Sequence, residues 1–138
     1  MVEFAIVVPL LLALVFGIIE FGIMIYDKAM ITNACREGAR AGILYTIKDD
    51  NGDGKPDRQA RIQDVVDNYL STYLITFGTA NTPTITYNPT DPDILAVGSD
   101  TYLSVTVNYN YGFLLVPALI GNIAPQVTLS STSTMRVE

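Results

Sequence analysis

The chain has 138 residues, 49% of them hydrophobic and 16% charged, with a formal net charge of −6. This size accommodates one domain with an additional segment. The acidic balance argues against nucleic acid as a partner, because phosphate binding requires clustered lysine and arginine. The sequence contains no histidine, so it offers no imidazole for acid–base catalysis or for binding zinc or copper.

Hydrophobic residues concentrate at the N-terminus. Met1–Tyr26 contains two charged side chains, Glu3 and Glu20, whereas Lys48–Asp67 contains ten. Residues 4–26 would form roughly 34 Å of helix, which is long enough to cross a bilayer. A signal peptide would begin with a basic stretch, but the acidic Glu3 stands there instead. We therefore expect a retained helix rather than a cleaved signal peptide.

The absence of proline and the frequent alanines after Asp27 predict that this helix continues to residue 45. Its first part, 1–26, would lie in a membrane or a filament core, and its second part, 27–45, would be amphipathic. Pro9 and the glycines at 17 and 22 are the expected points of bending. A stripe of small side chains at a spacing of four predicts close helix packing, and its members are Ala34, Gly38 and Gly42.

The two glutamates of the N-terminal segment constrain whether lipid or neighbouring subunits surround it. A carboxylate in hydrocarbon costs several kcal/mol unless it is protonated, paired or close to the interface. Glu3 lies at the end of the segment, where an α-amino group could neutralise it. Glu20 lies deeper, and two interpretations remain open: a position near the lipid headgroups, or a contact with a polar group of a neighbouring subunit.

Three stretches of the N-terminal segment form a distinctive pattern: Met1-Val2-Glu3-Phe4-Ala5 followed by Pro9, then Gly17-Ile18-Ile19-Glu20-Phe21-Gly22, and then Thr32-Asn33-Ala34-Cys35-Arg36-Glu37-Gly38-Ala39-Arg40. This pattern resembles the TadE-like pilins of tight-adherence systems. It covers about the first 45 residues. Two residues precede Glu3 here, whereas the family's processing usually leaves four before the corresponding glutamate.

This resemblance implies the life cycle of a type IV pilin-like protein. A prepilin peptidase would remove a short leader in the inner membrane, and the pilus assembly machinery would then extract the subunit into an extracellular filament. The subunits would form a homo-oligomer through their N-terminal helices, with Glu3 pairing to an amino terminus in the growing fibre. Two other roles remain open: a minor pseudopilin or tip adhesin, and a bitopic membrane protein whose domain binds a ligand.

An acidic loop at residues 48–58 has the spacing of a calcium-binding loop. Carboxylate and amide side chains occupy its positions 1, 3, 5 and 9, glycine occupies position 6, and a backbone carbonyl is available at position 7. Ala60 replaces the bidentate glutamate of position 12, so Asp64 or water would have to complete the site. We expect Ca²⁺ at the following residues, with a solvated acidic turn as the alternative: Asp49, Asn51, Asp53, Lys55 and Asp57.

Residues 46–138 are expected to form a small globular domain. Apolar residues at spacings of three and four predict a second helix over 58–77, ended by Gly78, with its tyrosines in the core. Strands are predicted over 84–87, 94–97, 102–111 and 127–137, and 113–123 forms an apolar insertion. The fold class expected is α+β, with an antiparallel sheet laid on the C-terminal half of the long helix.

No constellation for catalysis can be assembled from this sequence. The single cysteine, Cys35, falls within the predicted long helix and is expected to act as a small apolar residue. Asp91 and Asp93 are separated by Pro92, which indicates a turn rather than a carboxylate pair. We therefore expect a non-catalytic protein without an organic cofactor.

Overall fold

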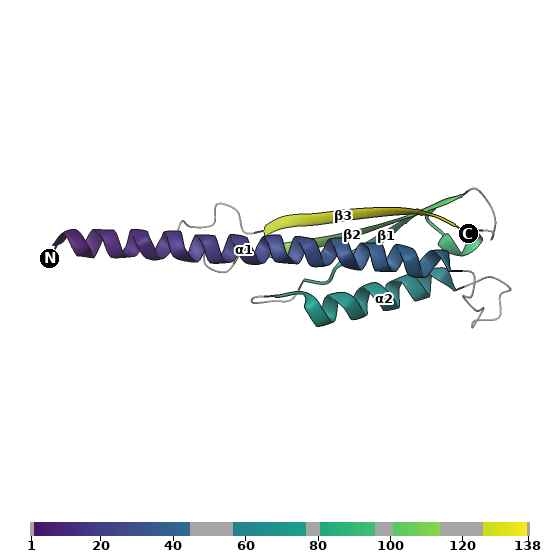
Figure 1. The fold of residues 1–138 in the computed structure, drawn as a ribbon, viewed down its shortest axis with the longest axis horizontal. Helices are drawn as coiled ribbons and strands as arrows, with labels where there is room; N and C mark the ends of the chain where they lie inside the picture. Colours follow the sequence, from purple (N-terminus) through teal and green to yellow (C-terminus); the bar gives the residue numbers. More distant parts are fainter. Residues whose placement is uncertain (1, 45–56, 77–80, 96–100, 114–125, 138) are drawn as a thin grey trace.

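The computed structural model describes residues 2–44, 57–76, 81–95, 101–113 and 126–137, and the side chains from residue 4 onward. Its longest element is α1 (Val2–Ile43), a helix of 42 residues and therefore about 63 Å. The N-terminal half of α1 projects beyond the rest of the chain, and every other element lies beside its C-terminal half (Figure 1). The helix continues through Pro9, Gly17 and Gly22 without interruption.

The second helix, α2 (Arg58–Tyr73), runs back along α1 and ends earlier than the predicted residue 77. Just after the end of α2, the Ile75 backbone N–H donates a hydrogen bond to the Asp27 Oδ1 atom on α1 at 3.0 Å. This N–H is therefore bonded to α1 and not to a carbonyl of α2. Leu74 is already extended. The proposed stop at Gly78 lies outside the described residues.

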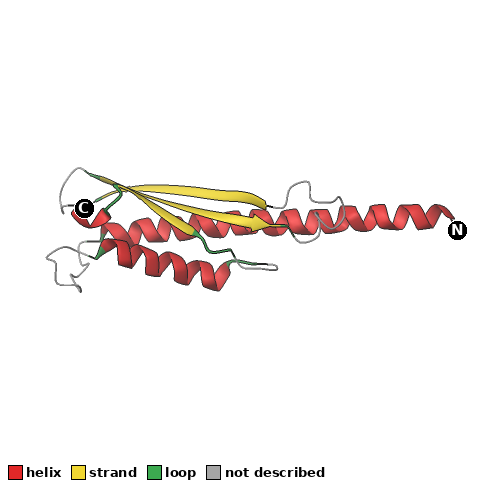
Figure 2. Ribbon diagram, turned by 180° about the vertical axis from the view of Figure 1, so that it is seen from behind, coloured by secondary structure: helices red, strands yellow, loops and turns green. Residues whose placement is uncertain are grey.

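Three antiparallel strands form one sheet in the order β1–β2–β3. The strands are β1 (Thr84–Asn88), β2 (Tyr102–Gly112) and β3 (Gln126–Arg136), with Thr86 opposite Thr106 and Thr106 opposite Thr132. Both helices lie on the same side of the sheet (Figure 2). The structure confirms the α+β class, whereas the strand predicted at 94–97 is wrong at its start: Pro92–Ile94 forms a 3₁₀ turn, η1.

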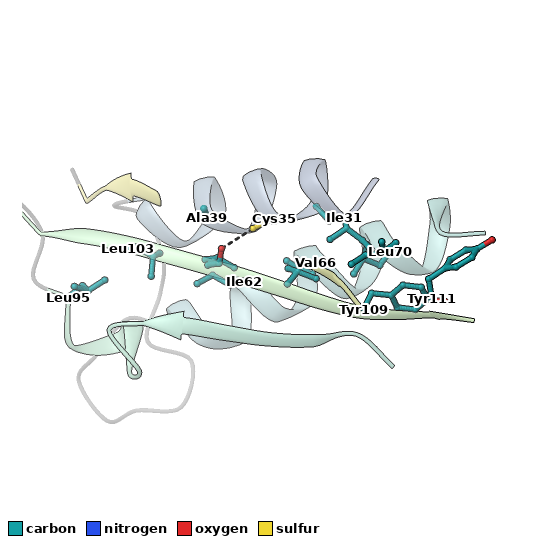
Figure 3. Close-up of a cluster of buried hydrophobic side chains, with 14 of the residues drawn as sticks. Ile31, Cys35, Ala39, Ile62, Val66, Leu70, Leu95, Leu103, Tyr109 and Tyr111 are labelled. Atoms are coloured by element: carbon teal, nitrogen blue, oxygen red, sulfur yellow. Dashed lines mark hydrogen bonds between the residues drawn. The ribbon is translucent and has the colours of Figure 1, made fainter. Parts of the chain in front are cut away.

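The core lies between the helices and the inner face of the sheet. Alternate residues of β2 are buried there, including Leu103, Val105 and Val107, as the period of a half-exposed strand requires. They form one hydrophobic cluster with Ile62 and Val66 of α2, in which Leu103, Ile62 and Val66 are labelled in Figure 3. Burial of these side chains is the main stabilising contribution, at about 1.5–3 kcal/mol for each fully buried aliphatic residue.

The outer face of the sheet carries short polar side chains in place of apolar ones. Hydroxyl groups pair across the strands at Ser104–Thr134, 2.7 Å, and at Thr106–Thr132, 2.8 Å. Each pair gives its two hydroxyl groups one hydrogen bond, and the partly or fully exposed side chains remain accessible to water. The apolar insertion predicted from residue 113 lies almost wholly outside the described residues, which include only Phe113.

Candidate functional site

Helix α1 has a bare half, residues 4–26, and a covered half, residues 27–43, against which the other elements pack (Figure 1). The bare half is the feature of this molecule that most requires a functional explanation. Its large apolar side chains are exposed all round the helix: Phe4 is 75% exposed, Leu10 71% and Ile18 65%. By length and composition, α1 is the one described helix that could cross a membrane. An apolar surface of this extent is unfavourable in water and marks a surface that contacts lipid or protein.

The assembly residues chosen from the sequence lie at different places on this helix. Pro9 is an exposed position within it. The backbone of Glu3 belongs to α1, and its side chain lies outside the described part of the chain. Glu20 is 3% exposed within its own chain, next to Tyr111, whose hydroxyl donates to the Glu20 backbone carbonyl at 3.5 Å. Neither environment considered for Glu20 from the sequence included burial by its own domain.

The small-residue stripe faces the chain's own domain. Ala34, Gly38 and Gly42 are all buried. A Cβ atom added to Gly38 would lie 2.5 Å from a methyl group of Val66, and one added to Gly42 would lie 2.6 Å from a methyl group of Leu103. The missing side chains therefore allow α2 and β2 to approach the α1 backbone, which fixes the domain to the helix.

A group of buried polar residues marks the place where the bare and covered halves of α1 meet. Asp27 is fully buried; its Oδ1 atom accepts from Ile75, and its Oδ2 atom has no hydrogen-bond donor among the described residues. Burial, together with the nearby carboxylates of Glu20 and Asp27, raises the pKa of Tyr111 to about 12. The raised pKa keeps the phenol of Tyr111 neutral to a higher pH than that of a solvent-exposed tyrosine.

A second buried polar residue binds the C-terminal end of α1. Arg58, at the start of α2, is fully buried, and its guanidinium donates to the Gly42 carbonyl in the last turn of α1. Burial lowers the pKa of Arg58, and the charge of Asp93 opposes that shift. Asp93 also accepts a hydrogen bond from the Gln59 N–H at 2.9 Å, which caps α2. Asp91 accepts from the Asp93 N–H, so both carboxylates have structural roles.

Asp27, Arg58 and Tyr111 were not identified from the sequence as special positions. Their partners lie 48, 16 and 91 residues away along the chain. The available signal was weak: Asp27 is the first charged residue after the apolar run, and Arg58 is the last residue of the acidic loop.

Most of the predicted calcium loop lies outside the part of the chain that the structure describes. Asp49, Asn51, Asp53 and Lys55 lie outside the described residues, and Asp57 is partly exposed just before α2. Asp64, the substitute ligand considered, is exposed and lies 3.7 Å from Arg61 in an ion pair. Within the described part of the chain, no three acidic or cysteine side chains are grouped closely enough to hold a metal ion.

The architecture defines a class of protein: a small α+β domain fixed to the C-terminal half of a helix of membrane-spanning length. Within that class, residues 1–40 match the family model described as TadE-like protein. The resemblance to this family is thereby confirmed over the N-terminal segment. No curated protein and no solved structure matches the chain. The match indicates a pilus-associated protein of a tight-adherence system, and together with the apolar helix it fits a membrane or cell-surface location.

Proposed function

We propose that this chain is a structural subunit of an extracellular type IV pilus-like filament, held together by bundled N-terminal helices. The observation that carries the proposal is the continuous exposed surface of the first half of α1, with Leu11 57% and Ile19 50% exposed. Lipid would cover this surface before assembly, and copies of the same helix would cover it in the filament. The proposed role is non-catalytic.

The rigid attachment of the domain supports this role. Glycine contacts along α1, the Asp27–Ile75 hydrogen bond and the Arg58–Gly42 hydrogen bond join the domain to one helix at three levels. Because the helix is continuous from the bare half into the domain, bundling the bare halves would set the spacing of the domains on the filament surface. This arrangement suits a repeating structural subunit.

The test of this proposal is electron microscopy of sheared cell-surface material with peptide identification of the filaments. We expect fibres that contain this chain as a major component, and a Glu3→Gln variant that reaches the membrane but yields few fibres. Leu10→Ile, a change within the apolar surface that keeps its hydropathy, is the control and should yield normal fibres. Fibres built by another chain, with this protein at low copy, would instead indicate a minor subunit.

We also propose that the acidic loop binds Ca²⁺, on the spacing of its oxygen-bearing side chains and Gly54. Mutual repulsion among the clustered aspartates favours a bound cation. Thermal unfolding of the full chain in detergent should shift upward with added calcium and downward with a chelator. An Asp53→Asn variant should lose this response, and a melting curve insensitive to chelator in the unaltered chain rules the metal out.

A further inference from the structure

The solvent-facing side of the covered half of α1 carries two arginines. Arg36 and Arg40 are exposed and lie one helical turn apart, on the side of α1 opposite the buried Ile31 and Gly38. Arg40 makes a long contact of 4.0 Å with Glu37, and no ion pair joins Arg36 to any residue in the described ranges. In a chain of net charge −6, these two exposed arginines form a small cationic surface, with Glu37 beside it.

A groove of suitable chemistry runs along the seam between α1 and α2. It has a volume of about 360 Å³. The rings of Tyr69 and Tyr73 lie together on one side of it, with centroids 4.7 Å apart. Tyr73 is 48% exposed, which corrects the expectation that both tyrosines belong to the core. The polar residues that line the groove include Glu37, Asp64, Asn68 and Thr72.

Two carboxylates beside a pair of aromatic rings suit a guanidinium group. Guanidinium binds carboxylates through parallel hydrogen bonds and stacks on aromatic faces. The groove's own arginine, Arg61, contacts Asp64 at 3.7 Å with both side chains more than half exposed. Such exposed pairs are weak, so an incoming arginine can displace Arg61 or share its carboxylate.

We propose that Arg36 of one copy of this chain inserts into the α1–α2 groove of a neighbouring copy, where it pairs with Glu37 and Asp64 and stacks on Tyr69 and Tyr73. This inference rests on the proposed filament function. Because α1 is one continuous helix, neighbours that bundle side by side through its bare half have the covered halves close to each other as well. The two contacting surfaces differ, so the contact is heterologous and can repeat along an open helical array.

Cysteine cross-linking between two differently tagged copies tests the contact in intact cells. One copy carries Arg36→Cys and the other Asn68→Cys, and mild oxidation should join them into a covalent product of the two tags. The matched control replaces the second site by Thr132→Cys, on the outer face of the sheet. We expect at least fivefold more product from the groove pair, and equal yields would overturn the proposal. The native Cys35 is buried and present in every arm.

Charge exchange provides an independent test. Arg36→Glu should reduce fibre yield at least fivefold, since it places a third carboxylate beside the groove of the next copy. Combining it with Asp64→Arg should restore most of the yield by reversing both charges. Arg136→Glu, with the same change of charge at an exposed position of β3, should leave the yield within twofold. Failure of the reciprocal variant to recover contradicts the pairing.

A further arm separates this inference from the filament proposal. Ile18→Cys, on the exposed bare half of α1, should cross-link to itself if the helices bundle. Product from Ile18→Cys without product from the groove pair would reject the Arg36 contact and keep the bundle. Loss of both products would reject the filament assembly itself. A groove product whose second chain proves to be a different protein would overturn the contact between copies.

Discussion

The two halves of α1 share one backbone but have opposite surroundings. In the first half, apolar side chains project in every direction, and Leu11 is 57% exposed. In the second half, Ile31 and Ala34 are fully buried on one side, while Arg36 faces solvent on the other. Small residues occur in both halves, but only those of the second half receive other elements: an added Cβ atom would meet Val66 at Gly38 and Leu103 at Gly42. The comparison shows that small side chains allow a domain to approach a helix without being sufficient to bring it there.

The largest effect is expected from placing a charge in the bare half. Leu11→Asp should cost about 2.5–3.5 kcal/mol of membrane insertion, the penalty for aspartate near the centre of a spanning helix. Cell fractionation should show loss of the protein from the membrane fraction, and the same substitution at the exposed Arg40 should not. Retention of Leu11→Asp in the membrane at the normal level would mean that the bare half does not lie in lipid.

Glycine substitutions compare the halves directly. Gly42→Ala should lower the free energy of unfolding by about 1–3 kcal/mol from overpacking, partly offset by about 1 kcal/mol of helix propensity. The reason is the close approach of Ile62 and Leu103, whose side-chain carbons would lie 2.6–2.8 Å from the new Cβ atom. Thermal unfolding of the full chain in detergent, followed by circular dichroism, provides the measurement.

Gly22→Ala is the matched control, because in the described part of the chain no atom beyond the adjoining helix backbone lies within 4 Å of a Cβ atom added there. It should leave the melting temperature unchanged or raise it slightly through helix propensity. Equal effects at the two glycines would contradict the division of α1 into a bare and a covered half.

The smallest effect concerns the junction between the halves and depends on pH. The pKa of Tyr111 is raised to about 12 in the folded chain by burial and by Glu20 and Asp27, whereas an unfolded tyrosine ionises near 10. The stability associated with the neutral phenol is fully present below pH 10 and is lost as the pH rises toward 12. Between pH 10 and 11 the loss is about 1 kcal/mol.

Tyr111→Phe should therefore show a shallower loss of stability over that range, measured by denaturant unfolding at several pH values. Tyr102→Phe, at an exposed tyrosine of the same strand, should retain the full pH dependence. Identical slopes for Tyr111→Phe and the unaltered chain would show that the junction does not hold Tyr111 neutral.

Local sequence patterns predicted most of the elements but fewer of their ends. The period of two in β2 and the apolar stripe of α2 located those elements to within a few residues, because each pattern reflects the face that must be buried. The predicted end of α2 was wrong, and the η1 turn was not predicted. Both depend on hydrogen bonds to remote residues, from Ile75 to Asp27 and from Gln59 to Asp93.

The sequence by itself determined the long apolar helix, the α+β class and the resemblance to TadE-like proteins, because hydropathy and short-range periodicity are local properties of the chain. Only the tertiary structure decided that Glu20 and Asp27 are buried by their own domain and that Gly38 and Gly42 receive α2 and β2. It also decided that Tyr73 lines a groove near the surface. Burial depends on which segments meet in space, and that information is distributed over residues far apart in the chain.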